Sequence, residues 1–286
     1  MKQLLILSGK GGTGKTTVSS AFIEFGKIKA FADCDVDAPN LHLVVSGTEN
    51  PIKTDYYGFE KAHIDALKCI GCGLCEKNCR FGAISNGKVS IYECEGCGVC
   101  ANICPVSAIE MKSHSSGSLM LYKQNDSIFS TACLKMGSGA SGKLVSEVKK
   151  QLLENAPPLK LAVIDGSPGI GCPVIASISG VDIALIVAEP TISGIHDMKR
   201  IAETLAHFGV SFAVCINKFD VNLSNTKRIE DYCAELQIPV IGEIPFDETV
   251  IKAVNCCRSI ASYPDSPAGR AIALIWEKLC ADYILD

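Results

Sequence analysis

A glycine-rich loop near the start of the chain is the first stretch whose residue types and spacing could do chemistry. It follows the apolar run Leu4–Leu7, and from Gly9 to Thr16 it fits the spacing G-x-x-x-x-G-K-[ST]. Glycines there let backbone N–H groups turn toward phosphate oxygens, and a helix beginning near Lys15 would add its positive dipole end. Lys15 is expected to reach the β- and γ-phosphates of a nucleotide, and Thr16 to ligate Mg²⁺. The predicted nucleotide-binding residues of this loop are Gly9, Lys10, Gly11, Gly12, Thr13, Gly14, Lys15, Thr16 and Thr17.

Two equal runs of cysteine form a second candidate site. The chain has 16 cysteines, and eight of them follow C-x₂-C-x₂-C-x₃-C twice, the second run beginning 25 residues after the first. Three thiolates separated by two residues each can surround the irons of a cluster, whereas zinc sites usually join two C-x-x-C pairs. Iron–sulfur ligation is therefore predicted, with zinc as the alternative. The runs are Cys69, Cys72, Cys75 and Cys79, and Cys94, Cys97, Cys100 and Cys104.

Acidic residues follow two of the expected strands. A strand ending near Asp33 would deliver Asp33 and Asp35 to the carboxyl edge of a parallel sheet, where ligands of open α/β sheets bind. A second buried strand, over 159–165, ends in Asp165. Asp33 could instead cap the turn that follows it, because Asp side chains bond nearby backbone N–H groups.

Apolar strands alternate with helical segments along most of the chain, but this rhythm stops in one central stretch. Residues 113–118 are predicted to be a return linker, and 119–128 a strand or hairpin outside the central sheet. The glycine- and serine-rich stretch 135–143 is interpreted as a connector, with contact to phosphate or to a partner as the alternative. The predicted domains are 1–57 (nucleotide-binding, first part), 58–116 (inserted module) and 117–286 (nucleotide-binding, second part).

Composition excludes several classes of protein. The 286 residues are 48% hydrophobic and 20% charged, which describes a globular protein with an ample core. The net charge of −4 argues against electrostatic binding to nucleic acid. No apolar run approaches a transmembrane helix, no signal peptide is evident, and the expected last helix lacks an excess of basic residues. We expect a cytoplasmic protein that binds neither nucleic acid nor membrane.

The stretch K-G-G-T-G-K-T-T at 10–17 resembles the deviant Walker A motif of the MinD/ParA/nitrogenase-iron-protein ATPases. This resemblance implies a slow or partner-stimulated ATPase and an ATP-dependent homodimer, in which Lys10 reaches the partner's phosphates; a solvated loop cation is the alternative. It also implies that Asp35 orients or deprotonates the attacking water near Mg²⁺ and that Asp33 lies near the metal. Asp165, in D-x-x-P-G, would contact Mg²⁺ through water. The expected catalytic residues are Lys10, Lys15, Asp35 and Asp165, and those expected around the adenine are Asn217, Lys218 and Pro245.

The cysteine runs resemble the bacterial two-cluster ferredoxin, in which the fourth cysteine of each run ligates the other run's cluster. One [4Fe–4S] cluster would then be held by Cys69, Cys72, Cys75 and Cys104, and the other by Cys94, Cys97, Cys100 and Cys79. Arg80 departs from the ferredoxin pattern, because it stands where Pro105 follows the second run. The whole chain resembles MinD-superfamily ATPases with an inserted ferredoxin domain. The implied fold is a doubly wound, mostly parallel α/β P-loop sheet interrupted by an α+β ferredoxin module.

These features favour an ATPase whose nucleotide cycle gates electron transfer to an unidentified redox or metalloenzyme partner. The expected cofactors are ATP, Mg²⁺ and two [4Fe–4S] clusters. Delivery of clusters or metal to another enzyme is the alternative function, and a spatial organiser like MinD or ParA is a third, against which the acidic charge counts. Cys172, just behind the expected switch loop, could join a dimer-bridging site or be a small packed residue.

Overall fold

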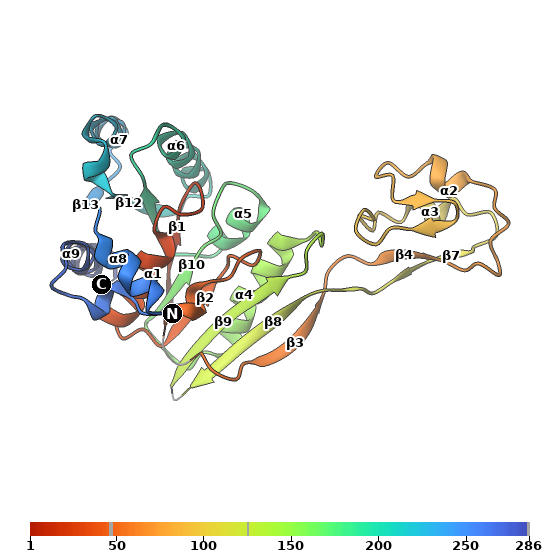
Figure 1. Cartoon of the computed structure of the whole chain (residues 1–286), viewed down its shortest axis with the longest axis horizontal. Coiled ribbons are helices and arrows are strands. Elements are labelled where there is room, and N and C mark those ends of the chain that lie inside the picture. Colours follow the sequence, from red (N-terminus) through yellow and green to blue (C-terminus); the bar gives the residue numbers. More distant parts are fainter. Residues whose placement is uncertain (46–47, 125, 285–286) are drawn as a thin grey trace.

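The computed structural model describes residues 1–45, 48–124 and 126–284. Its centre is a nine-stranded sheet in the order β13-β12-β11-β1-β10-β2-β9-β8-β3 (Figure 1). From β13 at one edge through to β9, all neighbouring strands in this order run parallel to one another. The last two strands, β8 and β3, each pair antiparallel with the strand before them. The strands are β1 (Lys2–Leu7), β2 (Ala30–Asp33), β3 (Ile52–Tyr57), β8 (Ser115–Gln124), β9 (Ser127–Leu134), β10 (Leu161–Asp165), β11 (Ile183–Ala188), β12 (Ser211–Asn217) and β13 (Val240–Ile244). The expected mostly parallel α/β sheet is confirmed.

Helices cover both faces of this sheet. Alternate side chains of β1 enter different cores, Leu5 and Leu7 on one face and Leu4 and Ile6 on the other, because successive strand residues point to opposite faces. The first face packs against α4 (Ser141–Asn155), α5 (Cys172–Ile178), α6 (Ile192–His207) and α7 (Leu223–Glu235), and the second against α1 (Lys15–Phe25), α8 (Glu248–Asn255) and α9 (Pro267–Leu279). Short turns are η1 (Leu41–Leu43), η2 (Phe219–Val221), η3 (Ile260–Ser262) and the π-helical η4 (Cys280–Ile284). None of the helices in the described ranges has the length and apolarity needed to cross a bilayer.

The hairpin of β8 and β9 corrects the prediction for residues 113–128. The described part of the stretch expected outside the central sheet belongs to the hairpin of β8 and β9 within it, because β9 pairs in parallel with β2 and β8 pairs with β9. Residue 125 of that stretch lies outside the described residues. Stacked rings link these strands: Phe129 lies 4.9 Å from Phe31 and 5.1 Å from Tyr122, measured between ring centroids. The serines expected to form a linker begin β8, where they pair with the edge strand β3.

A separate lobe fills the segment between β3 and β8. Strands β4 (Lys61–Ile64) and β7 (Ile109–Lys112) form a two-stranded antiparallel ribbon that leads away from the central sheet (Figure 1). The lobe also contains α2 (Leu74–Lys77), β5 (Ile84–Ser85), β6 (Lys88–Val89) and α3 (Val99–Asn102). It has its own small core, formed by Ala62, Ala83, Ile84, Cys94, Cys100 and Ile109. The lobe occupies the segment expected to be inserted, while its identity as a ferredoxin domain stays a prediction.

Candidate functional site

The loop between β1 and α1 needs glycine at particular positions. Gly12 and Gly14 have φ of +81° and +93°, a region that residues with a Cβ rarely adopt. A Cβ on Gly14 would lie 2.3 Å from Nδ2 of Asn217, and one on Gly9 would lie 2.1 Å from Cβ of Asp197. The loop backbone is therefore pressed against β12 and α6, which fixes the direction in which its N–H groups face.

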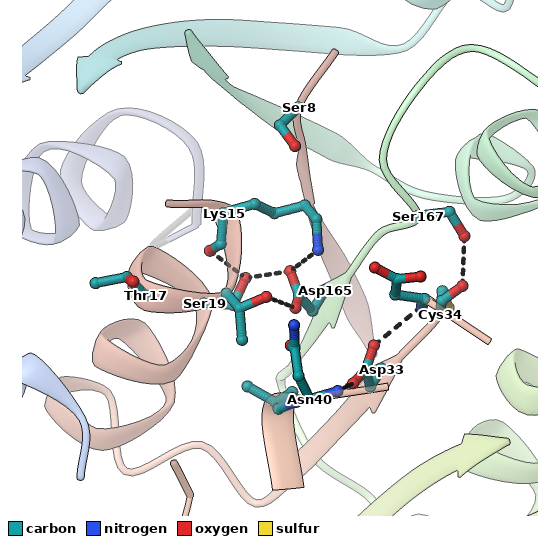
Figure 2. A network of polar contacts seen from close by, with 12 residues as sticks. Ser8, Lys15, Thr17, Ser19, Asp33, Cys34, Asn40, Asp165 and Ser167 are labelled. Carbon is teal, nitrogen blue, oxygen red and sulfur yellow. Dashed lines mark hydrogen bonds and ion pairs between the residues drawn. The ribbon is translucent and has the colours of Figure 1, made fainter. Parts of the chain in front are cut away.

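Lys15 and Asp165 form a buried ion pair at the carboxyl edge of the sheet. Nζ of Lys15 lies 2.8 Å from Oδ1 of Asp165, with 6% and 0% of the two side chains exposed. The hydroxyls of Thr16 and Ser19 donate to the same carboxylate at 2.7 and 2.8 Å (Figure 2). Burial alone would lower the pKa of Lys15, but the neighbouring carboxylates, Asp165 foremost, raise it. The amine is therefore held charged where it can bind phosphate.

Asp33 stabilises the loop that follows β2 through hydrogen bonds to its backbone. Its carboxylate accepts backbone N–H groups from Asp35 at 3.0 Å, Asn40 at 2.9 Å and Leu41 at 3.0 Å (Figure 2). This is the capping arrangement that the sequence left open for Asp33. Burial, followed by the charge of Asp165, raises the pKa of Asp33 to about 7.

Asp35 is half-buried and lines the same cavity as Thr16. Burial is the largest cause that raises its pKa. A carboxylate with a raised pKa is a better proton acceptor than an ordinary Asp, and this property suits a residue that deprotonates water.

Two adjoining cavities open beside the glycine-rich loop. The larger, of about 490 Å³, extends from the loop to Asp35 and Pro168, and the smaller, of about 210 Å³, lies beside Asn217, Lys218 and Pro245. Residues common to both cavities are Gly12, Gly14, Thr17 and Val250. Most of the predicted phosphate residues and all three predicted adenine residues therefore line adjoining cavities. The predicted loop residues that line neither cavity are Gly9, Lys10 and Thr13. The two cavities are suited to the charged and the apolar ends of a nucleotide.

Some residues of these cavities were not predicted. Val250 and Arg258 belong to α8 and the segment after it, far from every motif, and no sequence signal marks them. Asn217 was predicted, and the structure adds that its Nδ2 donates to the Thr13 carbonyl at 2.7 Å, which ties β12 to the loop.

Lys10 is paired within its own chain. Its Nζ lies 3.0 Å from Oε2 of Glu189 and donates to Oγ1 of Thr191 at 3.2 Å, while Lys218 approaches the other oxygen of Glu189 at 2.9 Å. Burial alone would raise the pKa of Glu189, but hydrogen bonds from Lys218 and Lys10 lower it. Sequence reasoning missed Glu189, because it lies in no recognised motif, unlike Asp165 in D-x-x-P-G. The reach of Lys10 across a dimer stays a prediction.

In the lobe, the eight cysteines of the two runs line two cavities. One is lined by Cys69, Cys72, Cys75 and Cys104, and the other by Cys79, Cys94, Cys97 and Cys100. The fourth cysteine of each run therefore lies with the first three of the other run. Gly71, Gly73, Gly96 and Gly98 all have positive φ, which lets the backbone curl around each cavity.

The donor set of these cavities can be tested against a metal. In the described part of the chain, no three His, Cys, Asp or Glu side chains converge closely enough for a single metal ion. Cluster ligands bind different irons, so their sulfurs lie farther apart than the ligands of one zinc ion. The backbone N–H of Ala108 donates to Sγ of Cys104 at 3.2 Å, and this bond lowers the pKa of that thiol. Four thiols per cavity and an N–H directed at sulfur are compatible with an iron–sulfur cluster, which stays a prediction.

The fold and the glycine-rich loop define a P-loop nucleotide-binding protein of the α/β class. More specifically, the chain belongs to the family described as the CobQ/CobB/MinD/ParA nucleotide binding domain, whose profile matches residues 4–257. An uncharacterized protein of Methanocaldococcus jannaschii is 33% identical over 290 residues, covering 97% of this chain and 96% of that protein.

More distant similarities agree with this family. The solved structure of the septum site-determining protein MinD from Pyrococcus horikoshii, complexed with Mg-ADP, superposes with a TM-score of 0.59 at 16% identity, covering 99% of this chain and 97% of that one. An iron-sulfur cluster carrier protein of Pyrococcus abyssi is 23% identical, over 97% of this chain and 85% of that protein.

Proposed function

We propose that this protein is an ATPase in which a nucleotide-dependent dimer cycle gates electron transfer by two [4Fe–4S] clusters. The observation that carries the proposal is the presence, in one chain, of a P-loop site and of two cavities lined by four cysteines each. The inserted segment would then be a ferredoxin domain, and the reduced thiols that it needs suit the cytoplasm.

ATP binding would reorganise the buried pair at the P-loop. Lys15 and Thr16 both bond Asp165 in the structure. When a triphosphate and Mg²⁺ are present, Lys15 would move to phosphate oxygens and Thr16 to the metal, which releases Asp165 toward a metal-bound water. Asp35 would orient the attacking water and accept its proton.

Dimerisation would require Lys10 to leave Glu189. That ion pair is partly exposed, with 34% of the Lys10 side chain and 16% of the Glu189 side chain accessible, so its opening costs about 1 kcal/mol or less. The phosphates of a second subunit offer more negative charge than one carboxylate. The exchange of partners would therefore link the oligomeric state to the bound nucleotide.

The two cysteine cavities would supply the redox function. Clusters held by the four cysteines of each cavity would supply one-electron transfer between an external low-potential donor and an acceptor protein. The chain's own contribution is to hold the thiolates and to place backbone N–H groups, such as that of Ala108, near sulfur. Such bonds stabilise the added negative charge of a reduced cluster.

One experiment tests the proposal as a whole. Protein purified without oxygen is analysed for iron and acid-labile sulfide and sized with ADP and with a non-hydrolysable ATP analogue. It is then reduced with dithionite, freed of excess reductant, and assayed for electron transfer to a dye. We expect about eight irons per chain, a dimer with the analogue only, and a transfer rate that differs between the nucleotides. Transfer that is identical with and without nucleotide would refute gating.

Cluster or metal delivery is the second candidate function, favoured by the similarity to an iron-sulfur cluster carrier protein. Cysteines in the ferredoxin arrangement hold clusters tightly, which counts against donation. Incubation with an apo-ferredoxin acceptor and ⁵⁵Fe-labelled protein separates the two functions, because only a carrier loses label to the acceptor. Co-sedimentation with lipid vesicles or DNA tests the third hypothesis, that the protein is a spatial organiser, because only such a protein would sediment with them.

A further inference from the structure

The glycine-rich segment 135–140, here named the junction loop, connects β9 to α4. One residue of the junction loop has a strained backbone conformation, which indicates that neighbouring contacts constrain the loop. Ala140 has φ of +72°, in the left-handed region that a side chain with a Cβ avoids. Strain of this kind persists only where surrounding contacts impose it. The segments on either side of Ala140 contact the nucleotide site and the lobe.

The start of the junction loop is tied to the acidic loop of the nucleotide site. The N–H of Leu134, the last residue of β9, donates to the carbonyl of Val36 at 2.8 Å. Val36 directly follows Asp35, which lines the nucleotide cavity. A shift of the Asp35 loop would therefore pull on the first residue of the junction loop.

The end of the junction loop is tied to the segment behind Asp165. A Cβ on Gly142, at the start of α4, would lie 3.1 Å from the carbonyl of Cys172, at the start of α5. At the other end of α5, the buried amine of Lys149 on α4 donates to the carbonyls of Ser177, at 2.8 Å, and Ser179. Helix α4 thus contacts both ends of α5. Movement of the loop 166–171 would carry α5 and, with it, the start of α4.

The middle of the junction loop contacts the lobe. A Cβ on Gly137 would lie 3.2 Å from the ring of Tyr92, and one on Gly139 would lie 3.3 Å from Oε2 of Glu95. Glu95 lines the cavity of Cys79, Cys94, Cys97 and Cys100, and Tyr92 lies two residues before Cys94. These glycines leave room for the approach.

Lys135 forms hydrogen bonds with the start of β8, next to the lobe. Its N–H donates to the carbonyl of Ser116 at 2.8 Å, and its Nζ donates to the hydroxyl of Ser115 at 2.8 Å. Both serines belong to the start of β8, where the ribbon of the lobe joins the sheet (Figure 1). The junction loop therefore touches both the stalk of the lobe and the edge of one cysteine cavity.

We propose that the junction loop is the docking surface on the ATPase for the Tyr92–Glu95 edge of the lobe, and that nucleotide exchange controls this docking. The inference rests on the proposed function. Without a γ-phosphate, Asp165 holds Lys15, and the edge lies against Gly137 and Gly139 with 77% of Tyr92 still exposed, as in the structure. A bound triphosphate draws Lys15 away, the loop 166–171 and α5 shift, and the edge is released. Release frees the Glu95 side of the cavity of Cys79, Cys94, Cys97 and Cys100 for a redox partner.

Hydrogen exchange measured by mass spectrometry tests this docking in the full-length, cluster-loaded protein. In the wild type we expect peptides covering 88–97 to exchange several-fold faster with a non-hydrolysable ATP analogue and Mg²⁺ than with ADP. In Tyr92→Ala these peptides should exchange fast with either nucleotide, so the difference disappears. The matched control is Leu67→Ala, because Leu67 is 99% exposed in the lobe and far from the junction loop in sequence. It should keep the wild-type difference.

The outcomes separate this inference from the proposed function. Iron content and nucleotide-dependent electron transfer are measured on the same preparations. A full exchange difference in iron-replete Tyr92→Ala would overturn the docking inference and leave gating intact. Absence of the difference in the wild type, where transfer still responds to nucleotide, would do the same. A wild type in which transfer ignores the nucleotide would overturn the proposed function itself.

Discussion

Nζ of Lys15 lies 2.8 Å from Oδ1 of Asp165, although the two residues are 150 positions apart in the chain. β1 and β10 are neighbouring parallel strands, so both residues reach the same edge of the sheet. The amine that would bind phosphate and the carboxylate that would bind metal are thus held together until a nucleotide separates them. The ion pair therefore stabilises the nucleotide-free fold, and it also holds in place the two groups that would bind phosphate and metal.

Asp165→Asn should therefore destabilise the nucleotide-free protein. The substitution leaves Lys15 buried without its partner, and such a break costs about 3 kcal/mol or more. Urea unfolding followed by the fluorescence of Trp276, the only tryptophan, measures this. Trp276 packs on Phe22 of α1, with ring centroids 5.0 Å apart, and so reports on the ATPase core. Asp231→Asn, at an exposed ion pair, is the control and should change stability by about 0.5 kcal/mol or less; equal losses would contradict the prediction.

The raised pKa of Asp33 predicts that the stability of the fold depends on pH. Its pKa of about 7 in the folded protein exceeds that of an unfolded Asp, so the folded state binds more protons between about pH 4 and pH 7. The contribution of Asp33 is therefore greatest at low pH and declines as the pH rises through this window. The stability difference between wild type and Asp33→Asn, from urea unfolding at several pH values, should shift in favour of the variant as the pH rises. A shift in favour of the wild type would show that Asp33 is ionised throughout.

Much of the nucleotide site could be predicted because its residues lie in local motifs. The P-loop, Asp35 and Asp165 each follow an apolar strand, and parallel strands bring their carboxyl ends to one edge whatever their order. The cysteine sites could be predicted for the same reason, because the spacing of each run is contained within eleven consecutive residues. The structure groups the eight in the crosswise sets that the ferredoxin resemblance implied, but whether they hold clusters stays a prediction.

The missed features depend on contacts between distant segments. Residues 119–128 carry no mark that they belong to the central sheet, because their place depends on Phe129 meeting Phe31. Glu189 is one acid among many until the fold brings it beside Lys10 and Lys218. Asp33 was expected near the metal or as a cap, and only the three N–H groups around it show the cap.

Glu189→Gln should favour the ATP-dependent dimer. The substitution removes the charge that holds Lys10 and Lys218 within their own chain. Because the pair is partly exposed, the gain is at most about 1 kcal/mol per subunit, and since the dimer opens two such pairs, the dimer dissociation constant should fall by up to about 30-fold. Analytical ultracentrifugation with the non-hydrolysable analogue measures it. Lys10→Ala serves as the opposite control and should weaken the dimer, whereas a weaker dimer with Glu189→Gln would mean that Glu189 acts across the interface.

The crosswise grouping of the cysteines gives the sharpest prediction for the lobe. Cys69→Ala and Cys104→Ala affect the same cavity, so the double variant should lose no more iron than either single variant, about four per chain. Cys69→Ala combined with Cys79→Ala affects both cavities and should lose about eight.

If each run instead held its own cluster, the two results would be exchanged. Iron and acid-labile sulfide are counted after purification without oxygen. Cys133→Ala, at an exposed position outside both cavities, should keep the full iron content. Losses in that control would mean that iron content reports general instability of the chain, and the pairing would then be decided by the EPR signal of the cluster retained in each single variant.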